Sequence, residues 1–146
     1  MKVLLQILGW SIATLILLQF IKIDVPPPPK ATPQDEIKAP KEVMSILKKS
    51  CYDCHSNETK WPWYSNIAPI SWQVKSNVKN GRNWLNFSIW NKYSQEKKQK
   101  LYRGMVNALK IKMPPAEYLL IHKEARLTPK ERRVLQDWAQ NQIKEN

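Results

Sequence analysis

Apolar residues fill the first part of the chain almost without a break. The run from Val3 to Ile21 contains few polar residues and is flanked by Lys2 and Lys22. As a helix rising ~1.5 Å per residue, it approaches the ~30 Å hydrocarbon thickness of a bilayer, and it exceeds the ~7–15-residue apolar segment of a cleaved signal peptide. A cleaved secretory signal is the alternative, but no small-x-small cleavage site follows. The pattern therefore predicts an uncleaved transmembrane signal-anchor over residues 1–23.

Prolines separate this run from the rest of the chain. Residues 24–40 contain the run Pro26–Pro29 and further prolines that include Pro33 and Pro40. Consecutive prolines favour polyproline II, an extended conformation of ~3.1 Å per residue that makes a semi-rigid spacer. We therefore expect a Pro-rich linker over residues 24–40 and one folded domain over residues 41–146.

Beyond the linker, apolar residues recur at the spacing of a helix face. The spacing predicts a helix that ends before Cys51, a helix from Pro69 to about Val78 with Gly81 as its C-terminal cap, and a helix that begins after Ser94. Thr128-Pro129-Lys130-Glu131 is a capping box with Pro at the first helical position, so it predicts the start of a last helix. The domain is expected to be all-α. The apolar positions that set the spacing are Val43, Ile46, Leu47, Leu101, Tyr102, Met105, Val106, Leu109, Val134, Leu135, Trp138 and Ile143.

Cys51-Tyr52-Asp53-Cys54-His55 is the stretch with the clearest chemistry. Cys-x-x-Cys-His is the attachment signature of a c-type haem, because two thiols one helical turn apart can add to the vinyl groups while the adjacent imidazole reaches the iron. A structural zinc site needs four ligands at paired spacings, whereas the chain has 2 Cys and 2 His in total. A thioredoxin-like pair needs a βαβ context, and no strand pattern is visible nearby. The motif predicts one covalent haem c, attached through Cys51 and Cys54, with His55 as an axial ligand.

Met113 is the best candidate for the second axial ligand of the iron. It precedes Pro114, and a residue before proline is restricted to extended conformations, so this loop can present a thioether to an open haem face. Met/His ligation raises the reduction potential of a cytochrome c. Met105 lies on a predicted apolar helix face, where core packing explains a methionine. His122 is the alternative to Met113, and bis-His ligation would lower the potential.

An aromatic-rich segment, Trp61–Trp72, follows the haem motif. Burying such side chains against a porphyrin is favourable by about 25 cal/mol per Å² removed from water. Pro69 or a neighbouring carbonyl is the expected acceptor for the ring N–H of His55. The less regular segment Trp84–Trp90 is a further candidate cover for the haem. The expected pocket residues of the aromatic segment are Trp63, Tyr64, Pro69 and Trp72.

The chain is strongly basic, with a formal net charge of +12. Its lysines and arginines are scattered rather than gathered in a tail, and no nucleic-acid-binding motif accompanies them. We therefore expect no nucleic acid partner. Positive charge around a haem edge would instead steer redox proteins with acidic docking surfaces.

The order of helix, Cys-x-x-Cys-His, loops, Met-Pro and terminal helix is that of class I cytochromes c. Beyond the linker, a family resemblance is carried by Cys51 to Thr59, Pro62 to Ile67, Pro69, Ser71-Trp72, Leu85 to Ser88, Trp90, Met113-Pro114, Tyr118, His122, Glu124 to Leu127 and Trp138-Ala139. In these residues the sequence resembles a small bacterial haem-binding domain family of membrane-anchored or secreted c-type cytochromes. The resemblance implies a single covalent haem with His55 as axial ligand. Lys112 departs from that pattern, where an acidic residue is more usual.

These expectations combine into a membrane-anchored monohaem c-type cytochrome that transfers single electrons and is not an enzyme. Because haem attachment to this motif takes place outside the cytoplasm, the location predicted is a single pass through the inner membrane with the haem domain facing the periplasm. The alternative is a haem enzyme or a sensor of peroxide or a diatomic gas, with an open or labile sixth position. A structural or assembly subunit of a larger complex is a third interpretation.

Overall fold

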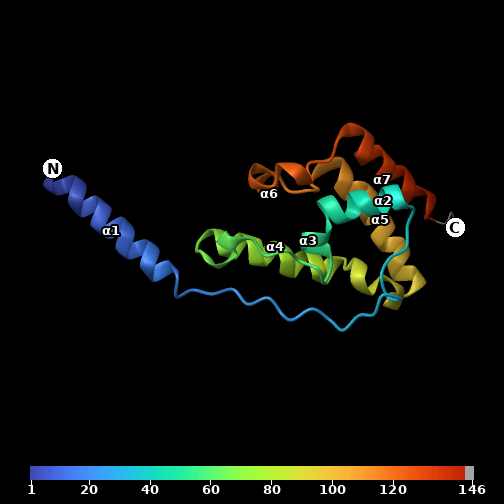
Figure 1. Cartoon of the computed structure of the whole chain (residues 1–146), viewed down its shortest axis with the longest axis horizontal. Coiled ribbons are helices and arrows are strands. Elements are labelled where there is room, and N and C mark those ends of the chain that lie inside the picture. The colour runs from blue at the N-terminus through green and yellow to red at the C-terminus, as the bar shows by residue number, and fades with distance from the viewer. Residues whose placement is uncertain (144–146) are drawn as a thin grey trace.

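Every regular element in the part of the chain that the structure describes is a helix. The structure is a computed structural model and describes residues 1–143; the end of the predicted domain, residues 144–146, lies outside this range. Figure 1 shows a bundle of helices from which the N-terminal helix projects. The elements are α1 (Lys2–Leu18), α2 (Lys41–Ser50), α3 (Tyr52–His55), η1 (Trp63–Asn66), α4 (Ile70–Trp84), η2 (Phe87–Lys92), α5 (Gln95–Ile111), α6 (Ala116–Ile121), η3 (Lys123–Ala125) and α7 (Pro129–Asn141).

The predicted transmembrane helix is wrong. Helix α1 ends at Leu18 and has 17 residues, so at ~1.5 Å per residue it falls short of the ~30 Å hydrocarbon core. Among residues 1–143, no helix is both long enough and apolar enough to cross a membrane. This finding also overturns the predicted single-pass location in the inner membrane with the haem domain facing the periplasm.

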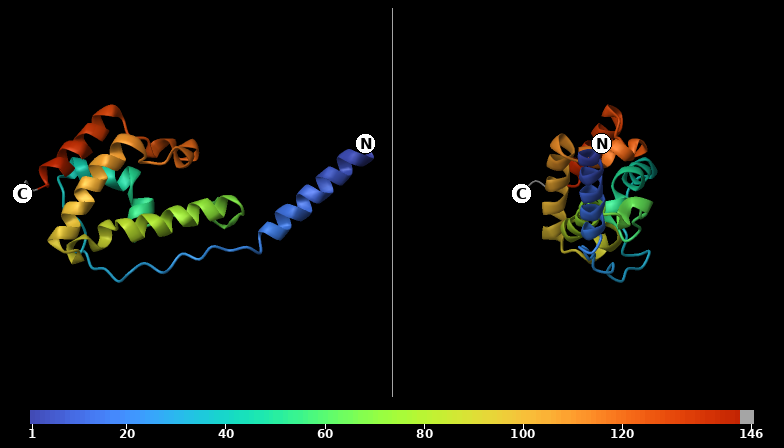
Figure 2. Two further views of the ribbon diagram at one scale, coloured as in Figure 1. Left: turned by 180° about the vertical axis from the view of Figure 1, so that it is seen from behind. Right: turned by 90° about the vertical axis from the view of Figure 1, so that its left-hand side faces the viewer.

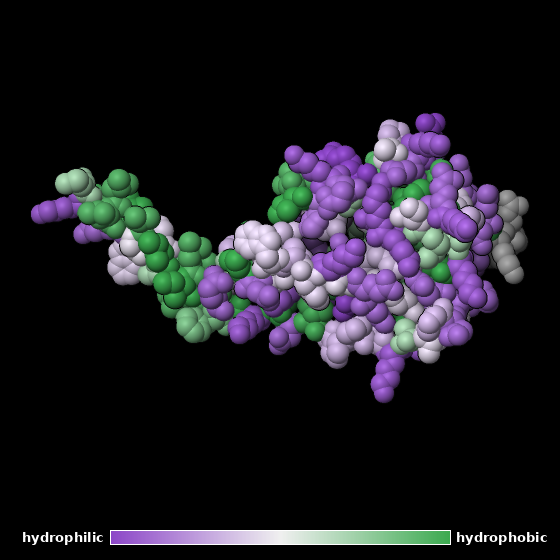
Figure 3. Space-filling model, in the orientation of Figure 1, coloured by the Kyte–Doolittle hydropathy of each residue, from purple (hydrophilic) through white to green (hydrophobic). Residues whose placement is uncertain are grey.

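The N-terminal segment contacts the helical domain through hydrogen bonds to backbone groups of that domain. The Gln19 side chain accepts a hydrogen bond from the Ala68 N–H at 2.9 Å and donates to the Ala68 carbonyl at 3.1 Å. The chain after α1 is extended (Figure 1), but the last part of the predicted linker packs on the domain. Ile37 is 2% exposed in the core, and its N–H donates to the Phe87 carbonyl. Figure 3 shows hydrophobic residues along α1 and a largely hydrophilic domain surface.

Three helices form the framework that carries the site. Helix α7 packs against α5 and α2 (Figure 2), and its Leu135 is fully buried between them. The predicted start of α7 is confirmed: the Thr128 hydroxyl accepts from the Glu131 N–H, and the Glu131 carboxylate accepts from the Thr128 N–H. Ser94 caps α5 as predicted, since its hydroxyl accepts from the Lys97 N–H. Capping satisfies amides that the first turn of a helix leaves unpaired.

Helix α4 does not end where the sequence indicates. It continues through Gly81 to Trp84, and no glycine in the described residues has a positive φ. Gly81 is therefore not a left-handed helix cap. Its role is close packing against the Cys-x-x-Cys-His turn.

Candidate functional site

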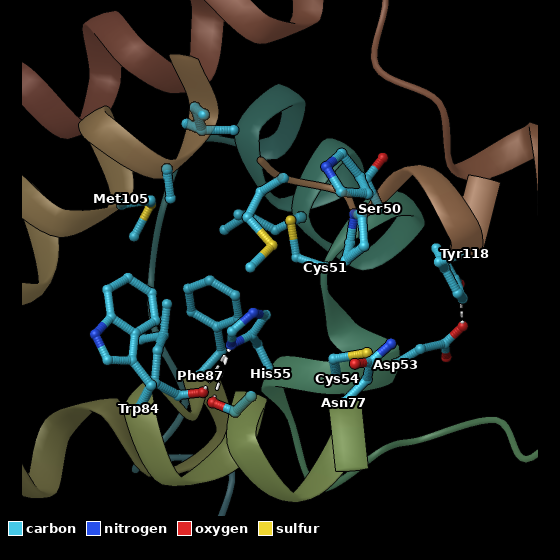
Figure 4. A pocket seen from close by; sticks show the side chains of 18 of the residues that line it. Ser50, Cys51, Asp53, Cys54, His55, Asn77, Trp84, Phe87, Met105 and Tyr118 are labelled. Carbon is cyan, nitrogen blue, oxygen red and sulfur yellow. Dashed lines mark hydrogen bonds between the residues drawn. The ribbon is translucent and has the colours of Figure 1, made fainter. Parts of the chain in front are cut away.

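The Cys-x-x-Cys-His motif forms a single helical turn on the wall of a cavity. The N–H groups of Cys54 and His55 donate to the Cys51 carbonyl at 3.2 and 2.9 Å. Residues three and four apart share one face of a helix, so both sulfurs and the imidazole line the same cavity of about 290 Å³ (Figure 4). Its other lining residues are Leu47, Ser50, Asp53, Asn77, Asn80, Gly81, Trp84, Leu85, Phe87, Met105, Ala108, Leu109, Met113, Pro114, Pro115, Tyr118 and Leu135.

Helix α4 orients the imidazole of His55. The His55 Nδ1 lies 3.1 Å from the carbonyl oxygens of both Gly81 and Leu85, and Figure 4 shows these contacts. Since a carbonyl can only accept, Nδ1 carries the proton and Nε2 keeps its lone pair. Burial lowers the pKa of His55, against the opposing effect of these two hydrogen bonds. The ring is therefore held neutral, with Nε2 available as a metal ligand.

Gly81 allows α4 to approach the motif this closely. A Cβ at this position would lie 2.5 Å from the backbone oxygen of Cys54 and 3.0 Å from its Cβ. Real side chains do not tolerate such contacts with backbone atoms. Glycine is thus required for the contact that gives His55 its acceptor.

The two cysteines are partly buried thiols. Burial, followed by the neighbouring Cys54, raises the pKa of Cys51 to about 12. Burial, followed by the charge of Asp53, raises the pKa of Cys54 to about 11. Neither is in a disulfide. Both side chains are therefore free, protonated thiols at neutral pH.

Asp53 fastens the motif to its surroundings. The Tyr118 hydroxyl of α6 donates to the Asp53 carboxylate at 2.7 Å, a contact drawn in Figure 4. The backbone N–H of Lys60 donates to the other carboxylate oxygen, and the Thr59 hydroxyl donates to the Asp53 carbonyl. Tyr118 lines the cavity, so this network holds α6 beside the motif.

Met113 lies in the turn between α5 and α6 and contributes to the cavity wall. Its placement outside a helix agrees with the restriction that Pro114 imposes. Met105 also lines the cavity, although it sits on the buried face of α5. Of the two, Met113 is the one whose backbone is not part of a helix.

His122 lies outside this cavity, at a smaller one of about 120 Å³. Its Nδ1 donates to the Glu124 carboxylate at 3.0 Å, and its Nε2 accepts from the Tyr64 hydroxyl at 2.5 Å. Its ring also stacks on Tyr118, with centroids 4.4 Å apart. Both ring nitrogens are engaged, so neither is free to bind a metal without breaking a hydrogen bond.

The four pocket residues expected from the aromatic segment lie away from the cavity. Trp63 is 79% exposed, and the Trp72 indole donates to the Ile21 carbonyl. Pro69 is the N-cap of α4, while Tyr64 is engaged with His122. Trp72 is far from the cavity because α4 is long and its C-terminal end is the part that passes His55. Trp72 therefore lies ~14 Å along the helix axis from Gly81.

Other aromatic residues surround the motif instead. Trp84 and Phe87 lie edge-on to the His55 ring, with centroids 6.0 and 6.2 Å away, and Tyr118 lies beside Asp53 (Figure 4). A signal for this wall exists in the sequence, because Asn77, Gly81 and Trp84 are spaced to share one helix face. The helix was predicted to end at about Val78, so Gly81 and Trp84 were not assigned to that face.

The lining of the cavity is suited to a flat, apolar group such as a haem. Its walls are largely apolar, which suits a flat macrocycle, and it brings together two thiols, a free imidazole nitrogen and a thioether. The Ser50 hydroxyl is buried in the same wall without a hydrogen-bond partner among the described residues, as expected where a bound group completes a site. Residues 1–143 hold no cluster of three or more His, Cys, Asp or Glu that would bind a bare metal ion.

Fold and site together define an all-α protein with a Cys-x-x-Cys-His turn in an apolar cavity. A family model described as a haem-binding domain matches residues 13–141. The chain belongs to this haem-binding domain family, and the family resemblance seen in the sequence is confirmed. Neither a search of curated proteins nor a search of solved structures found a match.

Proposed function

We propose that the protein is a monohaem c-type electron-transfer protein. Cys51 and Cys54 would form the thioether bonds, and His55 and Met113 would be the two axial ligands of the iron. The observation that supports this assignment is that all four side chains line one cavity. A bound haem would supply a one-electron redox couple.

The residues of the cavity would hold and tune that couple. The Gly81 and Leu85 carbonyls fix the His55 ring and increase its basicity as a ligand. Leu47, Phe87 and Leu135 keep water from the cavity wall, and burial disfavours the more charged ferric state. Trp84, which lines the cavity and is 42% exposed, marks where the cavity wall reaches the surface.

An electron carrier is favoured over a haem enzyme or sensor. A distal acid or base would be needed for peroxide chemistry, and His122 is the one histidine of the sequence besides His55. In the structure, His122 lies outside the haem cavity with both ring nitrogens hydrogen-bonded. Met113 beside the motif would fill the sixth position, which leaves no open coordination site for a small ligand.

The expected partners are redox proteins with acidic docking surfaces. The net charge of +12 supports this proposal, and Lys110 and Lys112 are exposed beside Met113. Opposite charges speed encounter, and salt screens them over a Debye length of ~10 Å at 0.1 M.

Electron exchange should therefore slow as salt is added. The reduced, full-length protein would pass its electron to an acidic acceptor protein. We expect the bimolecular rate constant of this reaction to fall about tenfold or more between low and high ionic strength. Stopped-flow absorption measures it. A basic acceptor protein is the control and should show the opposite trend. Absence of electron exchange with either acceptor, together with rapid binding of carbon monoxide, would instead favour the enzyme or sensor.

A further inference from the structure

Arg132 of α7 contacts the backbone on both sides of the end of α5. Its Nη1 donates to the Met113 carbonyl at 3.0 Å and also to the Leu109 carbonyl. Leu109 lies in the last turn of α5, which ends at Ile111. One guanidinium therefore ties α7 to the turn that carries Met113.

The end of α5 leaves a backbone carbonyl, that of Leu109, which needs such a donor. In a continuing helix, the Met113 N–H would donate to Leu109; here it donates to the Ala108 carbonyl at 3.1 Å, which also accepts from Lys112. The Leu109 carbonyl is thus left for Arg132. A positive charge at a helix C-terminus is favourable, and basic side chains commonly hydrogen-bond the last carbonyls.

The location of Arg132 connects this contact to the cavity. Leu109 and Met113 both line it, as does Leu135, which is fully buried one turn along α7 from Arg132. Arg132 is partly buried, whereas Arg133 is exposed. The sequence alone does not distinguish the two arginines, because both belong to the basic residues scattered along the chain.

We propose that Arg132 is a positioning residue for Met113. Its guanidinium fixes the backbone from Leu109 to Met113, so that the thioether stays at the cavity wall. A methionine side chain loses much rotamer freedom when it is held in place, and a fixed backbone reduces the further ordering that ligation requires. Lysine would not replace this residue fully, because a point charge lacks the rigid planar donors of arginine.

This inference rests on the proposed function, in which Met113 is an axial ligand. Its test uses the full-length, haem-loaded protein with Arg132→Gln and the matched control Arg133→Gln. The first readout is the ferric charge-transfer band of thioether-ligated iron, followed with temperature. We expect Arg132→Gln to lose the band at a lower temperature than wild type, while Arg133→Gln behaves as wild type.

The second readout needs no haem. Amide hydrogen exchange in the peptide covering residues 109–115 should be faster by roughly tenfold in Arg132→Gln, as the loss of charge-assisted hydrogen bonds predicts. Arg133→Gln should leave it unchanged. If Arg132→Gln does not fold, Arg132→Lys and Arg133→Lys form the equivalent pair, with the same direction expected for Arg132→Lys.

Two results overturn the inference, and they can be distinguished. Equal exchange in residues 109–115 of the two variants, with equal loss of the band, means that Arg132 does not position Met113. Absence of the band from the wild-type protein means that Met113 is not the ligand, so the proposed ligation fails and the inference fails with it.

Discussion

Met113→Ala is expected to abolish the ferric thioether charge-transfer band and to lower the reduction potential. Met/His ligation favours the ferrous state, and the choice of axial ligands changes the reduction potential of haem proteins over a range of ~0.8 V. With the thioether removed, the sixth position becomes open to water or to an added ligand. Absorption spectroscopy and potentiometric titration of the haem-loaded protein measure both effects.

His122→Ala is the control for this experiment, because His122 was the alternative ligand. Its nitrogens are bonded to Tyr64 and Glu124 outside the haem cavity, so the variant should keep the band and a potential close to wild type. Loss of low-spin character in His122→Ala, with Met113→Ala unaffected, would mean that His122 and not Met113 is the second axial ligand.

Gly81→Ala is expected to destabilise the protein and to disturb the His55 ring. The new Cβ would meet the Cys54 backbone oxygen at 2.5 Å; because backbone cannot rotate away, α4 must shift. Overpacking of this kind costs about 1–3 kcal/mol, or roughly 4–12 °C in the unfolding midpoint of a domain of this size. The shift would also lengthen the contact between His55 Nδ1 and the Gly81 carbonyl.

Gly9→Ala provides the matched control. A Cβ at Gly9 has no atom within 4 Å, and alanine favours a helix, so this variant should not lower the midpoint. Thermal unfolding of both haem-loaded variants, followed by circular dichroism, measures the difference. Equal midpoints would show that α4 and the motif are not packed as tightly as described.

The sequence was sufficient for the features that depend on local rules. Helical spacing and the capping box of Thr128 predicted α2, α5 and α7, because these signals act within one or two turns. The proposed ligands could also be named from the sequence, since a five-residue motif and a Met-Pro step each carry their own geometry. The structure then brings Cys51, Cys54, His55 and Met113 to one cavity.

The walls of the cavity depend on which end of α4 meets the motif, and spacing alone does not encode that. Gly81 resembles a helix cap locally, whereas its role follows from a contact with Cys54 that lies distant in sequence. The same applies to Arg132, whose acceptors lie in the last turn of α5 and in the loop that follows it. The transmembrane prediction failed for a different reason, since the length of an apolar run does not fix where its helix ends.

Covalent attachment of one haem to this chain is the central claim, and the intact mass of the denatured full-length protein tests it most directly. After maturation with haem, the protein is predicted to carry the mass of one haem that remains through denaturation. Cys51→Ser with Cys54→Ser should lose this addition. An unmodified mass for the wild-type protein, with haem released on denaturation, would contradict the claim.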